Sequence, residues 1–421
     1  MLTCNPALVL ARLTPYSFAA TTSFIARFIA GEPFTLQVEA HNASGQVTPN
    51  FGQEQTPVVP EVSPQRLLRP EGGRFESSLF STGELTRIAP GRYQSDNASW
   101  NEAGSLVLRA QLPNNRYLTA DADIGSEAQV GRFYPFGFEL DESSLLNACL
   151  SDTPFSYLGD PSIEAQYRLH AVNRAGNVLV NYTAEPNTNY QAQFGFTIVG
   201  SDIDGTRLFA NPDNAPSGIS NAAWLDGALS FNQSDVDTPR LLGIQRQTSN
   251  VEEGPYTGVE LGLIVEQNPD NINGIGVFTL DGTVDMIFGR LVLDNLAGPE
   301  DETLNIIARV ERWDGQRFVR HIADSCTQLT ASNFAIGANP NTLNSSVVRN
   351  AGEQMPLTLG LSSEDFGWSP AGASGEFEFS YQAPVWLRYN WDGSVEQDPS
   401  ATATFGQFRG NDRIIFWLER R

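Results

Sequence analysis

The chain has 421 residues, of which 40% are hydrophobic and 18% charged, a balance typical of folded domains rather than of disordered segments. Its 49 acidic and 26 basic residues give a formal net charge of −23, which disfavours nucleic acid and anionic membrane surfaces as partners. All of these basic residues are arginines, and the absence of lysine excludes P-loop, pyridoxal Schiff-base and lysine general-base chemistry. The length predicts roughly two to four domains.

The strand pattern is clear from residue 34 onward. Residues 34–40 alternate apolar and polar side chains, which predicts a β-strand with one buried face. The same period of two returns at residues 106–112, 304–310 and 377–381, and turns rich in glycine and proline separate these segments. Because no segment shows a sustained helical stripe, the predicted fold class is all-β.

An internal repeat links the first part of the chain to the second. Residues 12–18 (RLTPYSF) match residues 132–138 (RFYPFGF). Residues 42–51 then match residues 173–182 at an asparagine, a glycine, a valine, a second asparagine and an aromatic residue. Matches in a preserved order with a growing offset indicate a duplicated domain whose loops have diverged.

A further echo suggests the type of domain. Gly91–Arg92–Tyr93 is similar to Gly254–Pro255–Tyr256, and an alternating strand follows each. A turn glycine two residues before a tyrosine is typical of the tyrosine corner of an immunoglobulin-like sandwich. We therefore expect tandem immunoglobulin-like β-sandwiches at residues 1–128 and 129–284, the second with insertions, and a C-terminal β domain at 285–421 without a clear copy of the repeat.

The cysteines limit the covalent chemistry. Cys4, Cys149 and Cys326 show no metal-ligand spacing, and an odd number allows at most one internal disulfide with a free thiol left over. Cys149 and Cys326 are the more plausible pair because both lie beside turn-like Asp/Ser segments.

Targeting signals are not evident in the sequence. No stretch reaches the ~18–20 apolar residues of a transmembrane segment. Residues 1–12 lack the pattern of a signal peptide. We therefore expect either a fragment of a longer exported chain or a chain whose export signal has been removed.

Paired aspartates are the candidate metal ligands. Alternate residues of a strand share a face, so an Asp-x-Asp pair can offer oxygens to calcium. Asp121 and Asp123 come just before the second repeat, where a bound calcium ion would stiffen a tandem array; the alternative is solvated turn aspartates in an acidic protein. No other cofactor is expected. Two further pairs share the spacing: Asp202/Asp204 and Asp235/Asp237.

Aromatic residues gather near the C-terminus. Trp386, Tyr389 and Trp391 form either a patch for stacking sugars or docking proteins, or the core of the C-terminal domain. Residues 414–418 are apolar on both faces, which predicts a central strand.

The last third of the chain carries motifs that resemble a known family. These motifs are Phe288–Leu291, Trp313–Gly315, Trp386–Asp392 and Arg409–Ile415. They resemble the uncharacterised C-terminal region of MshQ-like proteins, which belong to the gene neighbourhood of the mannose-sensitive haemagglutinin (MSHA) type IV pilus of Gram-negative bacteria. The resemblance implies an exported, extracellular protein at the cell surface or on the pilus, with pilus components or a surface protein or glycan as partners. Family members often carry a lectin-like domain upstream, and this sequence shows none, so we do not expect their carbohydrate binding to carry over.

Catalytic patterns are weak. His41, His170 and His321 lie in strand-like contexts beside no nucleophile motif, and acid pairs among 49 acidic residues carry no signal without geometry. We therefore expect a non-enzymatic structural or adhesion protein. The alternatives are a pilus assembly factor, and a secreted carbohydrate-active enzyme or its accessory binding module.

Overall fold

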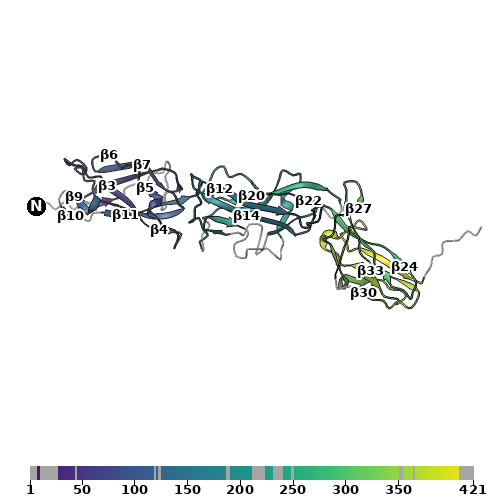
Figure 1. The fold of residues 1–421 in the computed structure, drawn as a ribbon. Coiled ribbons are helices and arrows are strands. Elements are labelled where there is room, and N and C mark those ends of the chain that lie inside the picture. Colours follow the sequence, from purple (N-terminus) through teal and green to yellow (C-terminus); the bar gives the residue numbers. More distant parts are fainter. Residues whose placement is uncertain are drawn as a thin grey trace, which may run out of the picture.

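The computed structural model describes residues 7–9, 27–42, 45–117, 120–121, 125–185, 190–210, 223–230, 240–247, 251–349, 354–363 and 366–406. Within these ranges the regular elements are strands and single 3-10 turns, with no α-helix. The strands form three sandwiches that follow one another from the N-terminal end (Figure 1). The predicted all-β class with tandem immunoglobulin-like sandwiches is confirmed.

The first sandwich consists of one sheet in the order β1-β3-β7-β5, with β6 on β7, and a second in the order β2-β11-β8-β4. The predicted alternation at residues 34–40 is real, because every second side chain of β3 is buried. These side chains pack on Trp100 and Phe133 in one core. The elements are β1 (Ala7–Val9), β2 (Phe28–Ile29), β3 (Phe34–His41), β4 (Glu61–Arg69), η1 (Ser77–Leu79), β5 (Phe80–Ser81), β6 (Thr86–Ala89), β7 (Arg92–Trp100), β8 (Gly104–Gln111), η2 (Pro113–Asn115), β9 (Arg116–Tyr117), β10 (Ala120–Asp121) and β11 (Gly125–Tyr134).

The second sandwich repeats this arrangement with a larger core. One sheet has β14 between β12 on one side and β18 and β19 on the other, and the facing sheet has the order β13-β22-β20-β15. The elements are β12 (Gly137–Leu146), β13 (Ser156–Tyr157), β14 (Ile163–Val172), β15 (Gln193–Val199), η3 (Gly205–Arg207), β16 (Leu208–Ala210), β17 (Trp224–Leu225), β18 (Ala228–Ser230), β19 (Arg240–Ile244), β20 (Tyr256–Gln267), β21 (Phe278–Thr279) and β22 (Val284–Ile287).

The third sandwich, in green and yellow in Figure 1, is built on the order β23-β26-β27 and the order β24-β34-β33-β29. Phe377, Phe379 and Phe405 are fully buried in its core, as the alternation at 377–381 predicts. The elements are β23 (Gly289–Leu293), β24 (Leu296–Gly298), β25 (Leu304–Asn305), β26 (Ala308–Trp313), β27 (Phe318–Arg320), β28 (Gln328–Thr330), η4 (Ala331–Asn333), β29 (Phe334–Ile336), β30 (Val347–Arg349), β31 (Gln354–Pro356), β32 (Phe366–Trp368), β33 (Gly375–Tyr381), η5 (Val385–Leu387) and β34 (Ser400–Phe405).

All three sandwiches share one topology. Their first strands, β1, β12 and β23, pair antiparallel with β3, β14 and β26. Their short second strands, β2, β13 and β24, pair parallel with the last strands, β11, β22 and β34. The third sandwich therefore keeps the strand pairing of the other two, although its sequence shows no clear copy of the repeat.

One glycine marks the same point in each copy. The carbonyl groups of Gly91, Gly227 and Gly360 accept a hydrogen bond at 2.9 Å from the strands β3, β14 and β26 respectively. Each has a positive φ, between 70° and 80°, and an added Cβ at each would lie 2.4 Å from a backbone oxygen. Only glycine fits this conformation and this close approach.

This equivalence corrects the expected match of Gly91 with Gly254. Gly254 precedes β20, which pairs with β15 and β22, whereas the counterpart of Gly91 is Gly227. The Tyr93 hydroxyl donates to the Val58 carbonyl at 3.0 Å, 35 residues upstream, a longer span than that of a tyrosine corner. Tyr256 instead donates to a side chain, Oε2 of Glu253.

The domain boundaries stay a proposal. Strand pairing holds residues 125–134 in the first sandwich, so we propose Pro135 as the first boundary rather than 128/129. At the second boundary, β22 ends at Ile287 and β23 begins at Gly289, close to the expected 284/285. The repeat segment 12–18 and the predicted strand at 414–418 lie outside the described residues.

Candidate functional site

The first joint, between the first and second sandwiches, contains a buried carboxylate. Glu102 follows β7, is 3% exposed and accepts the backbone N–H groups of Val180 and Asn181 of the second sandwich at 3.1 Å each. It also accepts the N–H of Ala103 at 2.8 Å. Burial raises the pKa of Glu102, and the three N–H groups oppose this rise by favouring the charged form. Glu102 therefore depends on the second sandwich for two of the three N–H groups that stabilise its buried carboxylate.

Asparagines of the repeated loop complete this joint. The Asn181 side chain accepts from the Arg74 N–H at 2.7 Å and donates to the Arg74 carbonyl at 2.8 Å. Asn173 donates to the Asn101 carbonyl at 3.1 Å, while its own oxygen caps two N–H groups of its loop. The loop found by the sequence repeat is thus the surface that receives the preceding sandwich.

A buried ion pair supports the other side of the first joint. Arg132 of β11 contacts Asp270 of the second sandwich with 2.6 Å between Nη2 and Oδ2. Burial raises the pKa of Asp270, and the Arg132 charge opposes that rise. Removing Arg132 would leave the Asp270 carboxylate buried without its ion-pair partner.

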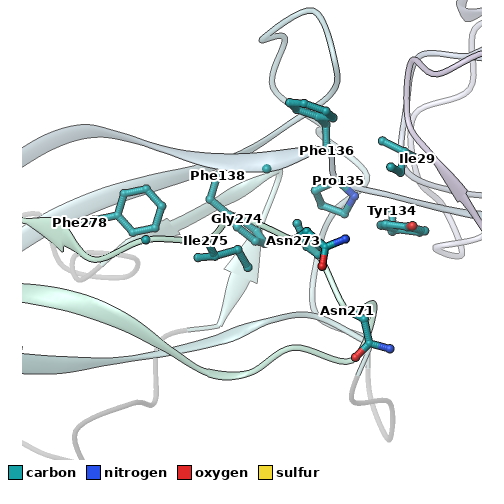
Figure 2. Close-up of a pocket in the computed structure, with 13 residues that line it drawn as sticks. Ile29, Tyr134, Pro135, Phe136, Phe138, Asn271, Asn273, Gly274, Ile275 and Phe278 are labelled. Carbon is teal, nitrogen blue, oxygen red and sulfur yellow. The ribbon is translucent and has the colours of Figure 1, made fainter.

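A cavity of about 500 Å³ lies at the same joint. Figure 2 shows Ile29 and Tyr134 on the side of the first sandwich and Ile275 and Phe278 on the side of the second. Its lining is largely apolar, with the amide groups of Asn271 and Asn273 at one side. The remaining lining residues are Pro135, Phe136, Gly137, Phe138, Ile272, Gly274 and Gly276.

The second joint, between the second and third sandwiches, contains a buried arginine. Arg246 occupies the position equivalent to Glu102, because Gly31 and Gly159 bond the carbonyls of Trp100 and Ile244, two residues before each. Burial lowers the pKa of Arg246, and the Glu396 carboxylate opposes this. Its guanidinium lies 4.1 Å from the Phe288 ring centre.

Arg246 donates to backbone oxygens of the third sandwich. Nη2 bonds the Gly289 carbonyl at 2.8 Å and also the Trp386 carbonyl, and Nη1 bonds the Arg388 carbonyl at 2.8 Å. Nη1 also pairs with Glu396 at 2.7 Å. The two joints are therefore closed by charged side chains of opposite sign at one equivalent position, one accepting backbone hydrogen bonds and the other donating them.

A cluster of three polar side chains is buried beside the second joint. The Tyr157 hydroxyl lies 2.7 Å from Nδ1 of His321 and donates to Oδ2 of Asp324 at 2.8 Å. Because the hydroxyl has one hydrogen, which Asp324 receives, Nδ1 of His321 is the donor to Tyr157. Burial lowers the pKa of His321 to about 4, although the Asp324 charge acts in the opposite direction.

The two cysteines favoured for pairing lie in different sandwiches. Cys149 follows β12 of the second, Cys326 follows β27 of the third, and their sulfurs are joined at 2.03 Å. Asp324 also accepts the N–H of Cys326 at 3.0 Å, so the Tyr157 cluster and the disulfide share one turn. Cys4 lies outside the described residues.

The aromatic residues singled out from the sequence lie at the second joint. The Trp386 carbonyl accepts Arg246, and the Tyr389 hydroxyl bonds Glu252 of the second sandwich. Trp391 is 40% exposed and packs on the Tyr389 ring with 5.1 Å between ring centres. A docking role for these residues stays a prediction.

The calcium hypothesis also stays a prediction. Asp121 lies in β10, its side chain is not described, and Asp123 lies outside the described residues, as do Asp235 and Asp237. Asp204 caps a turn by accepting the Thr206 N–H at 2.9 Å. Among the described residues, no group of three or more potential His, Cys, Asp or Glu ligands gathers for a metal ion.

Sequence reasoning missed Glu102 and Arg246. Gly31 and Gly159 donate equivalent backbone hydrogen bonds, and these give the alignment that makes Glu102 and Arg246 equivalent. Burial of their charges depends on the neighbouring sandwich, and a pattern within one domain does not show it.

The structure consists of three sandwiches whose two joints are closed by buried charges. The class is that of tandem all-β, immunoglobulin-like proteins. Models of the DUF6701 family match consecutively: its second domain at residues 7–103, its third at 102–284 and its fourth at 287–420. The chain belongs to the DUF6701 family. The match to the third domain begins before β8, although β8 and β11 pair within the first sandwich.

Solved tandem-domain structures are distantly similar. The Escherichia coli adhesin FdeC is 11% identical, with 94% of this chain and 97% of that chain covered and a TM-score of 0.41. The titin tandem I9–I11 is 9% identical, covering 90% and 94%, with a TM-score of 0.25. A tetra-tandem repeat from the extending region of a large adhesion protein is 11% identical, covering 96% and 74%, with a TM-score of 0.25. No protein with a curated description matches the sequence.

Proposed function

We propose that this chain is a non-enzymatic structural arm of an exported protein, at the cell surface or on a pilus of a Gram-negative bacterium, with a role in adhesion. One observation carries the proposal. Each joint is closed by a buried charge, Glu102 or Arg246, that bonds the backbone of the next sandwich.

Such joints favour a stiff array over a flexible string of domains. Domains that move independently are connected by exposed linkers with few contacts across them. Here the cores extend across both joints: Ala30 and Ala103 of the first sandwich and Trp313 and Tyr389 of the third pack with the core of the second. A stiff array projects one end away from the point where the other end is held, as an adhesive or filament-associated arm requires.

The buried acids support a structural rather than a catalytic role. Glu102 uses its oxygens to accept backbone N–H groups, and Asp324 accepts from Tyr157, Cys326 and Thr327. Among the described residues, no helix is both long enough and apolar enough to cross a membrane.

The link to the pilus depends on the motifs that resemble MshQ-like proteins. Of these, residues 386–392 form part of the second joint, since two of their carbonyls receive Arg246. This placement gives the motif a structural role at the second joint. A role as a pilus assembly factor is the alternative within the same biology.

Immunogold labelling of native cells with an antibody to this chain tests the proposal. We expect label on the outer surface or along filaments. Label confined to the periplasm would favour the assembly factor, and label absent from the envelope would contradict the proposal.

A further inference from the structure

The disulfide crosses the second joint at a particular point of the chain. Cys149 follows the first strand of the second sandwich, and Cys326 lies within the third, 177 positions later. We infer that this bond gives the chain a mechanical function: it transmits tension applied at the two ends from β12 directly to the third sandwich, so that residues 150–325 are shielded from extension. The inference rests on the proposed surface role, because an arm held at one end and loaded at the other is pulled along its length.

Connectivity determines the load path. A force applied upstream of Cys149 and downstream of Cys326 reaches both cysteines before it reaches the residues between them. The shielded segment holds every strand of the second sandwich except β12, and the strands β23 to β27 of the third. Those strands can lose their native contacts, but they cannot be drawn out while the bond is intact.

The loaded strand is well held. β12 pairs with β14 over its whole length, from Gly137 opposite Val172 to Leu146 opposite Glu164. Figure 1 shows these strands running lengthwise along the array. Tension therefore runs along a strand that is already extended, and β14, which lies in the shielded segment, carries none of it.

Buried groups position both cysteines for the bond. Cys149 forms two backbone hydrogen bonds with Phe155, at 2.9 and 3.1 Å, and Phe155 belongs to the core of the third sandwich. On the other side, Asp324 accepts the N–H of Cys326 and the hydroxyl of Tyr157. Tyr157 and Asp324 thus act as positioning residues that hold the two Cα atoms 5.8 Å apart, within the range that a disulfide spans.

Single-molecule force spectroscopy on the full chain, tethered by its two ends, tests this inference. In the oxidised protein we expect the fully extended molecule to lack the contour length of the shielded segment. Adding a reductant to the extended molecule should then release one step of roughly 600 Å, since 177 residues extend by at most about 3.3–3.6 Å each.

The double variant Cys149→Ser/Cys326→Ser should reach the longer contour length at once and show no step, whereas Cys4→Ser should behave as the wild type. A wild-type molecule that reaches the longer length without reductant would overturn the inference. The reductant step is measured on wild-type protein, so the test holds even where the double variant fails to fold. Its outcome is independent of the immunogold result, so failure of one proposal is distinguishable from failure of the other.

Discussion

Tyr157, His321 and Asp324 show how single residues hold the second joint. His321 is 2% exposed, and its Nδ1 group donates to a hydroxyl that is itself committed to Asp324. A second proton on this ring would add a charge in a place with little water. The cluster is therefore stable with a neutral histidine, and acid should weaken it.

The pKa of His321 gives a prediction about pH. Its folded value of about 4 lies below its ordinary value of 6.5, so the unfolded chain binds more protons between these values. The contribution of His321 to the free energy of unfolding is fully present above pH 6.5. It falls by about 3 kcal/mol as the pH drops to 4.

Urea unfolding at several pH values, followed for the transition of the third sandwich, measures this loss. The variant His321→Asn keeps an N–H donor near Nδ1 but does not titrate. We expect the advantage of wild type over this variant to shrink as the pH falls. An advantage that stays constant from pH 7 to 4 would contradict the assignment of a buried neutral histidine.

At the scale of the element, the repeated turn at Gly91, Gly227 and Gly360 defines the copies. In each copy the glycine carbonyl accepts a hydrogen bond from β3, β14 or β26. An added Cβ would meet a carbonyl oxygen, that of Thr48, Leu179 or His321 respectively. The requirement is steric as well as conformational, and the two parts can be separated by experiment.

Gly360→Ala and Gly372→Ala form a matched pair within the third sandwich. Both glycines have a positive φ, 70° and 67°, but an added Cβ lies 2.4 Å from the His321 oxygen at Gly360 and meets nothing within 4 Å at Gly372. We expect Gly372→Ala to cost about 1 kcal/mol of unfolding free energy and Gly360→Ala at least twice as much. Thermal unfolding of the two variants measures the difference, and equal costs would show that the close approach is not a constraint.

The sequence predicted elements better than the relations between them. Alternation identified the strands at 34–40 and 377–381, because burial on one face leaves a direct trace in the residues. The loop at 173–182 was recognisable because its asparagines and glycine satisfy the same local hydrogen bonds in both copies. The match of Gly91 with Gly254 was wrong because a glycine before a tyrosine is common in turns. The equivalence of Gly91 with Gly227 depends on strand pairing, which the sequence does not show.

The sequence did not predict the contacts that close the two joints. Glu102 and Arg246 differ in charge although they occupy one structural position, so similarity does not align them. Their partners are mostly backbone groups of the next sandwich, which any residue type supplies. Only the three-dimensional packing shows that these two charges are buried.

At the scale of the whole molecule, three sandwiches with two closed joints form one extended arm (Figure 1). The opposite polarity makes the two joints non-interchangeable, because an acceptor such as Glu102 does not satisfy the carbonyls to which Arg246 donates. We infer from these contacts that both joints are rigid.

Distances between spin labels across the second joint test this claim most directly. The labels are introduced as unnatural amino acids at the exposed positions Asp202 and Glu376, so that no cysteine is altered. We expect one narrow distance distribution in the wild type and in the control Arg168→Met, which changes an arginine whose side chain is 46% exposed. Arg246→Met, which leaves Glu396 and three carbonyls unpaired at a cost of about 3 kcal/mol, should broaden it. A broad distribution in the wild type would show that the sandwiches move independently and would contradict the account.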